Sequence, residues 1–446
     1  MNSLNDPPSK RYIHRIQAEG LFGQFDHDLN FGGKIPDNPN LLILYGENGT
    51  GKTTLLWLVY HLLNKELGKG HRTFLTHYRF KRLSVSFSDG LELSATREES
   101  TTGSFVMAMK HKSRPTAKFN YALDKEGALK QYVGDKTHIE FNQKLPEFNL
   151  GFLPHSRLTK PDEDPRTLQW RAVAEARARA KPGDVLPIQV SIAKALGIAR
   201  QQAITASNAG QFTANSIYAE LIEQISRMHL PVPETGGEDR RHNLIGRLES
   251  QSKTTMEYSK FGLISELQVQ GLINTLQTIP HDRLHLVIQV LEPFLRGNEA
   301  RFEALKILHI ALTTMVDTVN SLYLNKRMFL HLEKGLHILT LNNERLLPGQ
   351  LSSGEQELLI LFCELISALK QDTILLIDEP ELSLNVTWQK TLLDSLLRCA
   401  SGTNIQFLVA THSIELLARH RANVTRLSSL PLASKQPIPV GLKTDA

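Results

Sequence analysis

The sequence predicts an α/β fold in which one domain is split by a helical insertion. Segments typical of strands occur at both ends of the chain, and one of them runs into a glycine-rich turn followed by a helical pattern. Between about residues 165 and 325 the pattern is instead that of amphipathic helices. A chain of 446 residues is also too long for one compact core, which favours two or three substructures.

The N-terminal part reads as strands interrupted by one helix. Strand patterns cover residues 12–25, 26–31 and 41–45, with a turn expected between the first two. A helix is expected at Thr53–Leu63, and short strands return from Arg82 to about Phe152.

Residues 164–325 are expected to be helical, including the segments 166–180, 216–228 and 284–295. Between residues 302 and 322, apolar residues recur every three or four positions and form one stripe along the expected helix: Phe302, Leu305, Leu308, Leu312, Met315, Val319 and Leu322. Such a stripe indicates an internal packing helix, and a partner-facing or coiled-coil helix is the alternative. The segment Pro231–Asn243 is expected to be a loop.

Strand patterns reappear at 328–333 and 336–343, and a helix-strand-helix-strand run follows until about Leu417. The expected division is therefore a first lobe at 1–164 with a β-rich subdomain, a helical insertion at 165–327, a second lobe at 328–420, and a loosely ordered tail at 421–446.

Composition is that of an ordinary globular chain, with 41% hydrophobic and 22% charged residues. The sequence shows neither a run typical of a membrane helix nor a signal peptide, so we expect a cytoplasmic chain with no membrane partner. Cys363 and Cys399 lie in apolar helical patterns and are expected to be packed thiols. The net charge of +5 permits contact with nucleic acid without requiring it.

The glycine-rich turn matches the phosphate-binding pattern G-x-x-x-x-G-K-[ST] without a mismatch. Its glycines let successive N–H groups point at phosphate oxygens, and the new helix N-terminus adds a favourable dipole. Lys52 is expected to reach the β- and γ-phosphates of ATP, and Thr53 to ligate Mg²⁺. The predicted nucleotide-binding residues here are Gly46, Glu47, Asn48, Gly49, Thr50, Gly51, Lys52, Thr53 and Thr54.

Three later segments supply the rest of a hydrolytic site. A buried strand ends in Asp378 and Glu379, where Asp378 would hold Mg²⁺ and Glu379 would polarise the attacking water as general base. Leu351–Gln356 opens an apolar helix and brings Ser352, Ser353, Gly354 and Glu355. An ordinary helix N-cap is the alternative interpretation of that segment. A further strand ends in Thr411-His412-Ser413.

This order of motifs resembles an ABC-type ATPase head of the SMC/Rad50/RecF-like branch. The segments GLFGQFDHDL, LSSGEQELLILF and IDEPELSL, followed by ATHS, are more closely similar to the bacterial AAA15 or OLD-like ATPases. The resemblance covers about residues 12–60, 148–160 and 328–420. It implies a split ABC-type P-loop head, which dimerises so that the Ser352–Gly354 turn of one subunit meets the ATP held by the other. It also implies that His412 contacts the γ-phosphate, and that Pro380–Asn385 meets its equivalent across the dimer.

Two positions depart from the family pattern. Asn385 stands where the family usually has histidine. The segment Gly151–Leu158, which corresponds to the family's Q-loop, contains no glutamine. His155 or Ser156 would then help to position Mg²⁺ and water, and Arg157 is a further candidate.

Within this family the resemblance extends to stand-alone ATPases of the Septu, PARIS and retron-associated anti-phage systems. It implies a sensor that controls a separate nuclease of HNH or TOPRIM type. A membrane transporter is disfavoured by the 301 residues between Lys52 and Ser353, and too little chain follows Ser413 for a fused TOPRIM domain. The alternative is an ATPase of DNA repair or maintenance that clamps duplex DNA directly.

Two basic stretches bear on this choice, and DNA or a phage DNA-mimic protein could bind either one. Solvated faces are the alternative interpretation of both. The stretches are Lys65, Lys69, Arg72, Arg79, Lys81 and Arg82, and Lys110, Lys112, Arg114 and Lys118.

Overall fold

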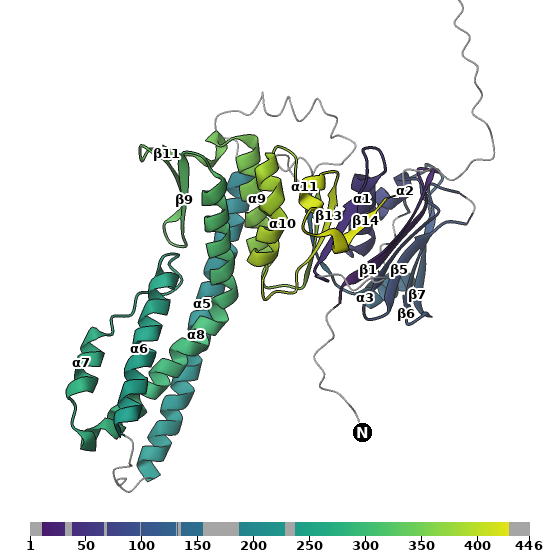
Figure 1. The fold of residues 1–446 in the computed structure, drawn as a ribbon. Coiled ribbons are helices and arrows are strands. Elements are labelled where there is room, and N and C mark those ends of the chain that lie inside the picture. The colour runs from purple at the N-terminus through teal and green to yellow at the C-terminus, as the bar shows by residue number, and fades with distance from the viewer. Residues whose placement is uncertain are drawn as a thin grey trace, which may run out of the picture. The chain divides into compact units, whose positions relative to one another are not determined.

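The computed structural model describes residues 11–31, 38–66, 69–98, 100–130, 132, 135–154, 187–227 and 237–427 (Figure 1). At 209–227, 237, 281–282 and 285–286 it describes the backbone alone. The chain packs into two compact units. Unit 1 comprises Met1–Ser156, Gln371–Leu392 and Asn404–Ala446, and unit 2 comprises Arg157–Lys370 and Leu393–Thr403.

Unit 1 contains two sheets and four short helices among its described residues. The strands are β1 (Ile13–Leu21), β2 (Phe25–Asn30), β3 (Leu41–Tyr45), β4 (Arg82–Phe87), β5 (Leu91–Thr96), β6 (Phe105–His111), β7 (Arg114–Tyr121), β8 (Asn149–Leu153), β12 (Thr373–Asp378), β13 (Gln406–Thr411) and β14 (Val424–Arg426). The helices are α1 (Lys52–Leu63), α2 (His71–His77), α3 (Lys136–Lys144) and α11 (Ile414–Leu417), with a 3-10 turn η2 (Arg421–Asn423). Helix α10 (Val386–Cys399) begins in unit 1.

One sheet of unit 1 is antiparallel and the other is parallel. The antiparallel order is β2-β1-β4-β5-β6-β7, and the parallel order is β14-β3-β13-β12-β8. In the parallel sheet Thr411 of β13 pairs with Tyr45 of β3, and Asp378 of β12 pairs with Ala410. The carboxyl ends of β3, β13 and β12 therefore lie at one edge, which is where open α/β sheets bind ligands.

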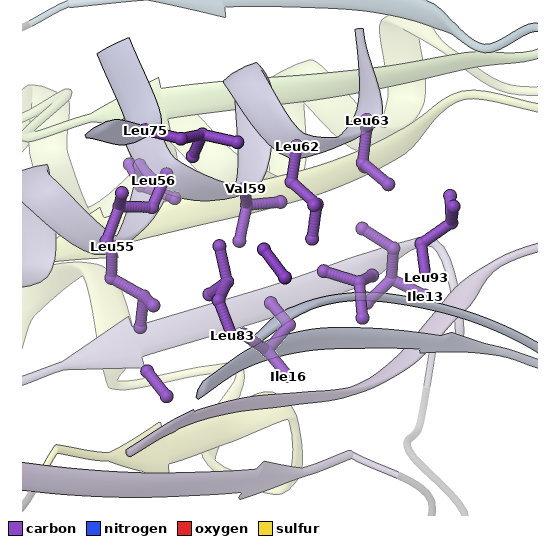
Figure 2. Close-up of a cluster of buried hydrophobic side chains, with 14 of the residues drawn as sticks. Ile13, Ile16, Leu55, Leu56, Val59, Leu62, Leu63, Leu75, Leu83 and Leu93 are labelled. Atoms are coloured by element: carbon purple, nitrogen blue, oxygen red, sulfur yellow. The ribbon is translucent and has the colours of Figure 1, made fainter. Parts of the chain in front are cut away.

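Helix α1 is held in place by an apolar core that it shares with the antiparallel sheet. Leu55, Val59 and Leu62 are fully buried. Figure 2 shows them on the helix above Ile16 of β1 and Leu83 of β4. Burying one such side chain contributes about 1.5–3 kcal/mol, so this packing fixes the helix whose first turn follows the glycine-rich loop.

Unit 2 is built mainly from helices and also contains a small sheet. Its elements are α5 (Pro187–Arg227), α6 (Gly237–Ser259), α7 (Gln270–Thr278), α8 (His281–Leu322), β9 (Lys326–His331), β10 (Gly335–Thr340), β11 (Arg345–Leu346), the 3-10 turn η1 (Pro348–Gln350) and α9 (Ser353–Ala368). The long helices α5 and α8 pack along each other, and β11-β10-β9 form an antiparallel sheet (Figure 1). None of the helices within the described ranges is long and apolar enough for a membrane span.

The predicted α/β fold class is confirmed, as are the strand-helix-strand order at the N-terminus and the run that ends near Leu417. The stripe on α8 is an internal packing surface: Leu305, Leu308, Leu312, Met315, Val319 and Leu322 are all buried. Cys363 and Cys399 are buried free thiols, as expected, and burial raises their pKa.

Several details differ from the prediction. The first turn lies at Phe22–Gln24, inside the segment expected to be one strand, because Gly20, Phe22 and Gly23 take positive φ values. Helix α6 already includes residues 237–243 of the expected loop. Within the expected tail, β14 pairs with β3 as an edge strand. The helical segment 166–180 and the tail beyond residue 427 lie outside the described residues.

Candidate nucleotide-binding site

The glycine-rich loop joins β3 to α1 and forms the first part of the site. Gly49 and Gly51 both have φ of 85°, a left-handed conformation that side chains with a Cβ rarely adopt. Glu47, Asn48 and Gly49 are exposed at the tip of the loop, and the first turn of α1 contains no acidic residue. The loop thus presents open backbone at a positive helix end, a combination suited to an anion such as phosphate.

Lys52 is the first residue of α1, and its ammonium is turned back into the loop. Nζ donates hydrogen bonds to the carbonyl oxygens of Gly46 at 2.9 Å and Glu47 at 3.0 Å. The side chain is only 4% exposed, and Glu379 Oε1 lies 3.9 Å from Nζ. Such an ammonium has three donors, so one remains for a phosphate oxygen beside the loop.

Thr53 and Asp378 provide oxygen atoms next to Lys52. Thr53 Oγ1 donates to Asp378 Oδ1 at 3.1 Å, and the Asp378 side chain is fully buried at the end of β12. A hydroxyl and a carboxylate side by side are oxygen donors of the kind that Mg²⁺ prefers, with the remaining positions left to phosphates and water. The two residues thus fit the predicted Mg²⁺ site, and their role as ligands stays a prediction.

Glu379 turns the chain sharply at the end of β12. Its φ is 45°, in the left-handed region, and its N–H donates to Ala410 O at 2.8 Å, which extends the ladder with β13 by one residue. A non-glycine residue in this conformation is uncommon, and it persists only where the surroundings impose it. The backbone therefore fixes where the Glu379 carboxylate stands, and the side chain is only 18% exposed.

His412 directly follows β13 and is the last residue of this group. Its Nδ1 lies 3.4 Å from Glu379 Oε1 and 3.2 Å from Glu381 Oε1, while the side chain is 40% exposed. Lys52, Asp378, Glu379 and His412 thus meet at one edge of unit 1, as their order in the sequence predicted.

Ser352, Ser353, Gly354 and Glu355 start helix α9 in unit 2. Ser352 is the N-cap, Glu355 N donates to Ser352 Oγ at 3.4 Å, and Ser352 N donates to Glu355 Oε2 at 2.9 Å. This capping box confirms the N-cap interpretation, whereas a contact with ATP stays a prediction. Ser352 is exposed and Ser353 is half-buried, so the helix start is open to a ligand.

Glu355 is anchored by a lysine that the motif does not include. Lys326 Nζ donates to both Glu355 oxygens, at 2.7 and 2.9 Å, and Tyr323 Oη donates to Glu355 O at 2.8 Å. Burial alone would raise the pKa of the Glu355 carboxyl, but the hydrogen bonds from Lys326 and Ser352 outweigh burial and leave that pKa below its ordinary value.

We expect Lys326→Met to destabilise unit 2 by about 3 kcal/mol, because it leaves a buried carboxylate without its cation. Thermal unfolding of the full chain should show a lower midpoint, whereas Lys306→Met, which removes an exposed ion pair with Glu303, should change little. Since the pKa of Glu355 is lowered by folding, this stabilisation is present at neutral pH and is lost as pH falls through the folded pKa. A midpoint difference that persisted undiminished below about pH 3 would contradict this account.

Three residues predicted to help position Mg²⁺ and water, His155, Ser156 and Arg157, lie outside the described residues. Two residues that sequence reasoning missed support the site. His27 contacts Thr50 O through Nε2 at 3.2 Å. The buried Glu381 holds the chain after β13. Glu381 stands two residues after Glu379, and only its burial distinguishes it from a solvated turn residue.

The arrangement is chemically suited to phosphoryl transfer to water. The Lys52 ammonium can neutralise charge on a transferring phosphoryl group, and the Glu379 carboxylate can accept a proton from the attacking water. A bound Mg²⁺ would polarise the phosphate oxygens. His412 offers a further hydrogen bond from a ring that two carboxylates hold in place.

Comparison with known families gives a match to an AAA-type family model that covers part of this site. The family model described as "AAA domain, putative AbiEii toxin, Type IV TA system" matches residues 225–418, which is less than half of the chain. The matched range includes Ser352–Glu355, Asp378, Glu379 and His412, and the glycine-rich loop lies outside it.

The chain is also similar to two lipoprotein-releasing system ATP-binding proteins named LolD. Identity is 39% over 72 residues with the protein of Jannaschia sp. (strain CCS1), covering 16% of this chain and 30% of that protein. With the protein of Ruegeria pomeroyi (strain ATCC 700808 / DSM 15171 / DSS-3), identity is 35% over 88 residues, or 20% of this chain and 37% of that one. The chain thus spans about a third of the length of these curated relatives.

Among solved structures, the chain aligns with Smc head domains. One is the Pyrococcus furiosus Smc head with an extended coiled coil, bound to the C-terminal domain of ScpA. Its TM-score is 0.37 at 12% identity, over 94% of this chain and 96% of that chain. Another is an Smc head bound to the C-winged helix domain of ScpA, with a TM-score of 0.36, 12% identity, and coverage of 95% and 98%. TM-scores this low add no weight to the assignment of fold or function. The glycine-rich loop, the strand order and the family match agree with one another: over part of its length the chain is similar to P-loop ATPases of the ABC/AAA type.

Proposed function

We propose that this chain hydrolyses ATP in a head-to-tail dimer and acts as a sensor that controls a separate nuclease in anti-phage defence. The observation that carries the ATPase part is the convergence of Lys52, Glu379 and His412 beside the Thr53–Asp378 pair. ATP and Mg²⁺ are the substrate and the metal that this group of residues fits.

The open start of α9 supports the dimer. An exposed Ser352 at a helix N-terminus is a favourable partner for the γ-phosphate of ATP held by a second subunit. The anchored Glu355 keeps this helix start in one conformation before any partner arrives.

Ser353→Arg should therefore block ATP-dependent dimerisation, because a long cation at the half-buried helix start would intrude on the phosphate. Light scattering with and without ATP measures the mass directly. Asn342→Arg, at an exposed position of the same unit, controls for the added charge. A Ser353→Arg chain that still dimerised with ATP would rule out the composite site.

Two observations support the sensor role. The family model that matches residues 225–418 is described as "AAA domain, putative AbiEii toxin, Type IV TA system", which suits a chain that works with a second component. In addition to helix α9, unit 2 contains a large helical region, α5 to α8, and this region offers room for a protein partner.

The test is a co-purification. The tagged chain is expressed with its neighbouring genes, and the complex is analysed by mass spectrometry with and without ATP, alongside the Ser353→Arg chain. A stoichiometric nuclease whose recovery depends on ATP supports the proposal. A lone ATPase that carries DNA supports the alternative, a clamp for duplex DNA.

The alternative is supported by one of the two basic stretches. Lys112, Arg114 and Lys118 are exposed on the β6–β7 hairpin, where Lys110 is half-buried. The other stretch is mixed. Lys69, Arg79 and Lys81 are exposed. Arg72 is buried and donates to His61 O, and Lys65 and Arg82 pair with Glu147 and Glu92. If DNA is retained, its affinity should fall steeply with salt, and Arg114→Glu with Lys118→Glu should reduce the slope by about 2.

A further inference from the structure

Glu381 is a buried carboxylate at the centre of the site, and none of the expected catalytic roles uses it. Its exposed fraction is 4%, and its Oε1 accepts hydrogen bonds from Thr411 Oγ1 at 2.6 Å, His412 N at 2.8 Å and Ser413 N at 3.2 Å. Three donors on one oxygen are a strong, charge-assisted arrangement. Glu381 therefore fastens the chain that leaves β13 to the turn that follows β12.

The same oxygen also faces the ring of His412. Nδ1 lies 3.2 Å from Glu381 Oε1 and 3.4 Å from Glu379 Oε1. Ionised carboxylates only accept hydrogen bonds, so two of them beside Nδ1 favour the tautomer of a neutral ring that carries its hydrogen on Nδ1. Nε2 is then the nitrogen available to a ligand, on a side chain that is 40% exposed.

We propose that Glu381 is a positioning residue for ATP hydrolysis, which sets the orientation and tautomer of His412 and thereby presents Nε2 to the nucleotide. This inference rests on the proposed ATPase activity. Altering the carboxylates that orient metal-binding histidines typically changes activity by about 10–100-fold, and we expect an effect of the same order here.

A purely structural role is the competing explanation, and the surrounding contacts allow the two to be separated. Ser413 keeps one contact that does not involve Glu381, because its Oγ donates to Gln389 Oε1 at 2.7 Å. Glu381→Gln keeps the length and one acceptor oxygen, so we expect the variant to fold.

The experiment is a double-mutant cycle on the full chain with Glu381→Gln, His412→Ala and the double variant, and Glu140→Gln on the exposed face of α3 as the control. We expect Glu381→Gln to lower kcat about 10–100-fold with KM for ATP nearly unchanged. In the His412→Ala chain the same substitution should change kcat less than about 3-fold, because the effect passes through the ring. Effects that multiply independently in the double variant would overturn the inference.

A second measurement does not depend on activity. Histidine labelled with ¹⁵N reports the tautomer of each ring, and the His412→Ala chain identifies the signal. We expect the hydrogen of neutral His412 on Nδ1 in the parental chain, and a mixed tautomer in Glu381→Gln. An unchanged tautomer would overturn the inference even if the chain hydrolyses ATP. A parental chain without ATPase activity would instead refute the proposed function and leave the tautomer result to decide about Glu381.

Discussion

Lys52→Ala should lose ATP binding at all practical concentrations. The ammonium holds the loop through Gly46 O and Glu47 O and supplies the cation nearest the phosphate site. A charge-assisted hydrogen bond contributes about 1.5–3 kcal/mol, so losing the one to a phosphate oxygen together with the two that hold the loop should weaken binding by at least about 100-fold. Titration with a fluorescent ATP analogue measures this directly.

Because Lys52 is only 4% exposed, its loss also affects the loop, and this effect needs a control. Lys52→Met retains the apolar stem and should unfold near the parental temperature while still failing to bind ATP. Lys65→Ala removes an exposed partner of Glu147 and should bind ATP normally. Parental affinity in Lys52→Met would refute the phosphate-binding role of the loop.

The second large effect is expected for Glu379→Gln, which should bind ATP and hardly hydrolyse it. The amide cannot accept the proton of the attacking water, and general base catalysis contributes about 10²–10⁴-fold. Gln keeps the same backbone demands as Glu at φ 45°, so the turn should survive the substitution. Removing a negative charge 3.9 Å from Lys52 Nζ should leave ATP affinity unchanged or higher.

Single-turnover release of phosphate and light scattering together test this expectation. In the proposed dimer the two subunits would separate only after hydrolysis, so the variant should form a long-lived dimer in ATP. Glu140→Gln again serves as the control for the loss of a carboxylate. Phosphate release at the parental rate would show that Glu379 is not the base.

The phosphate-binding pattern predicted Lys52, the apolar strand that ends in Asp-Glu predicted Asp378 and Glu379, and the family resemblance added His412. The carboxyl ends of parallel strands meet at one edge, and the register of β3, β13 and β12 places these residues there. Here local pattern and global topology agree, which is why residues about 330 positions apart could be assigned to one site.

Other features could not be predicted because they depend on packing rather than on spacing. Arg72 reads as part of a basic surface stretch, yet its guanidinium is buried and donates to His61 O. Glu381 reads as a turn residue, yet its role depends on three donors from residues 411–413, at and just beyond the end of β13. Neither environment leaves a mark on the local sequence.

The side-chain amide of Gln389 connects two segments of the site. Its Nε2 donates to Leu384 O at 2.9 Å, and its Oε1 accepts from Ser413 Oγ at 2.7 Å. The turn after β12 and the residue beside His412 are therefore linked through one side chain on α10. In the proposed dimer, a displacement imposed on residues 380–385 by a neighbouring subunit would be transmitted to His412 by this link. ATP hydrolysis at one site would then depend on the state of the other site.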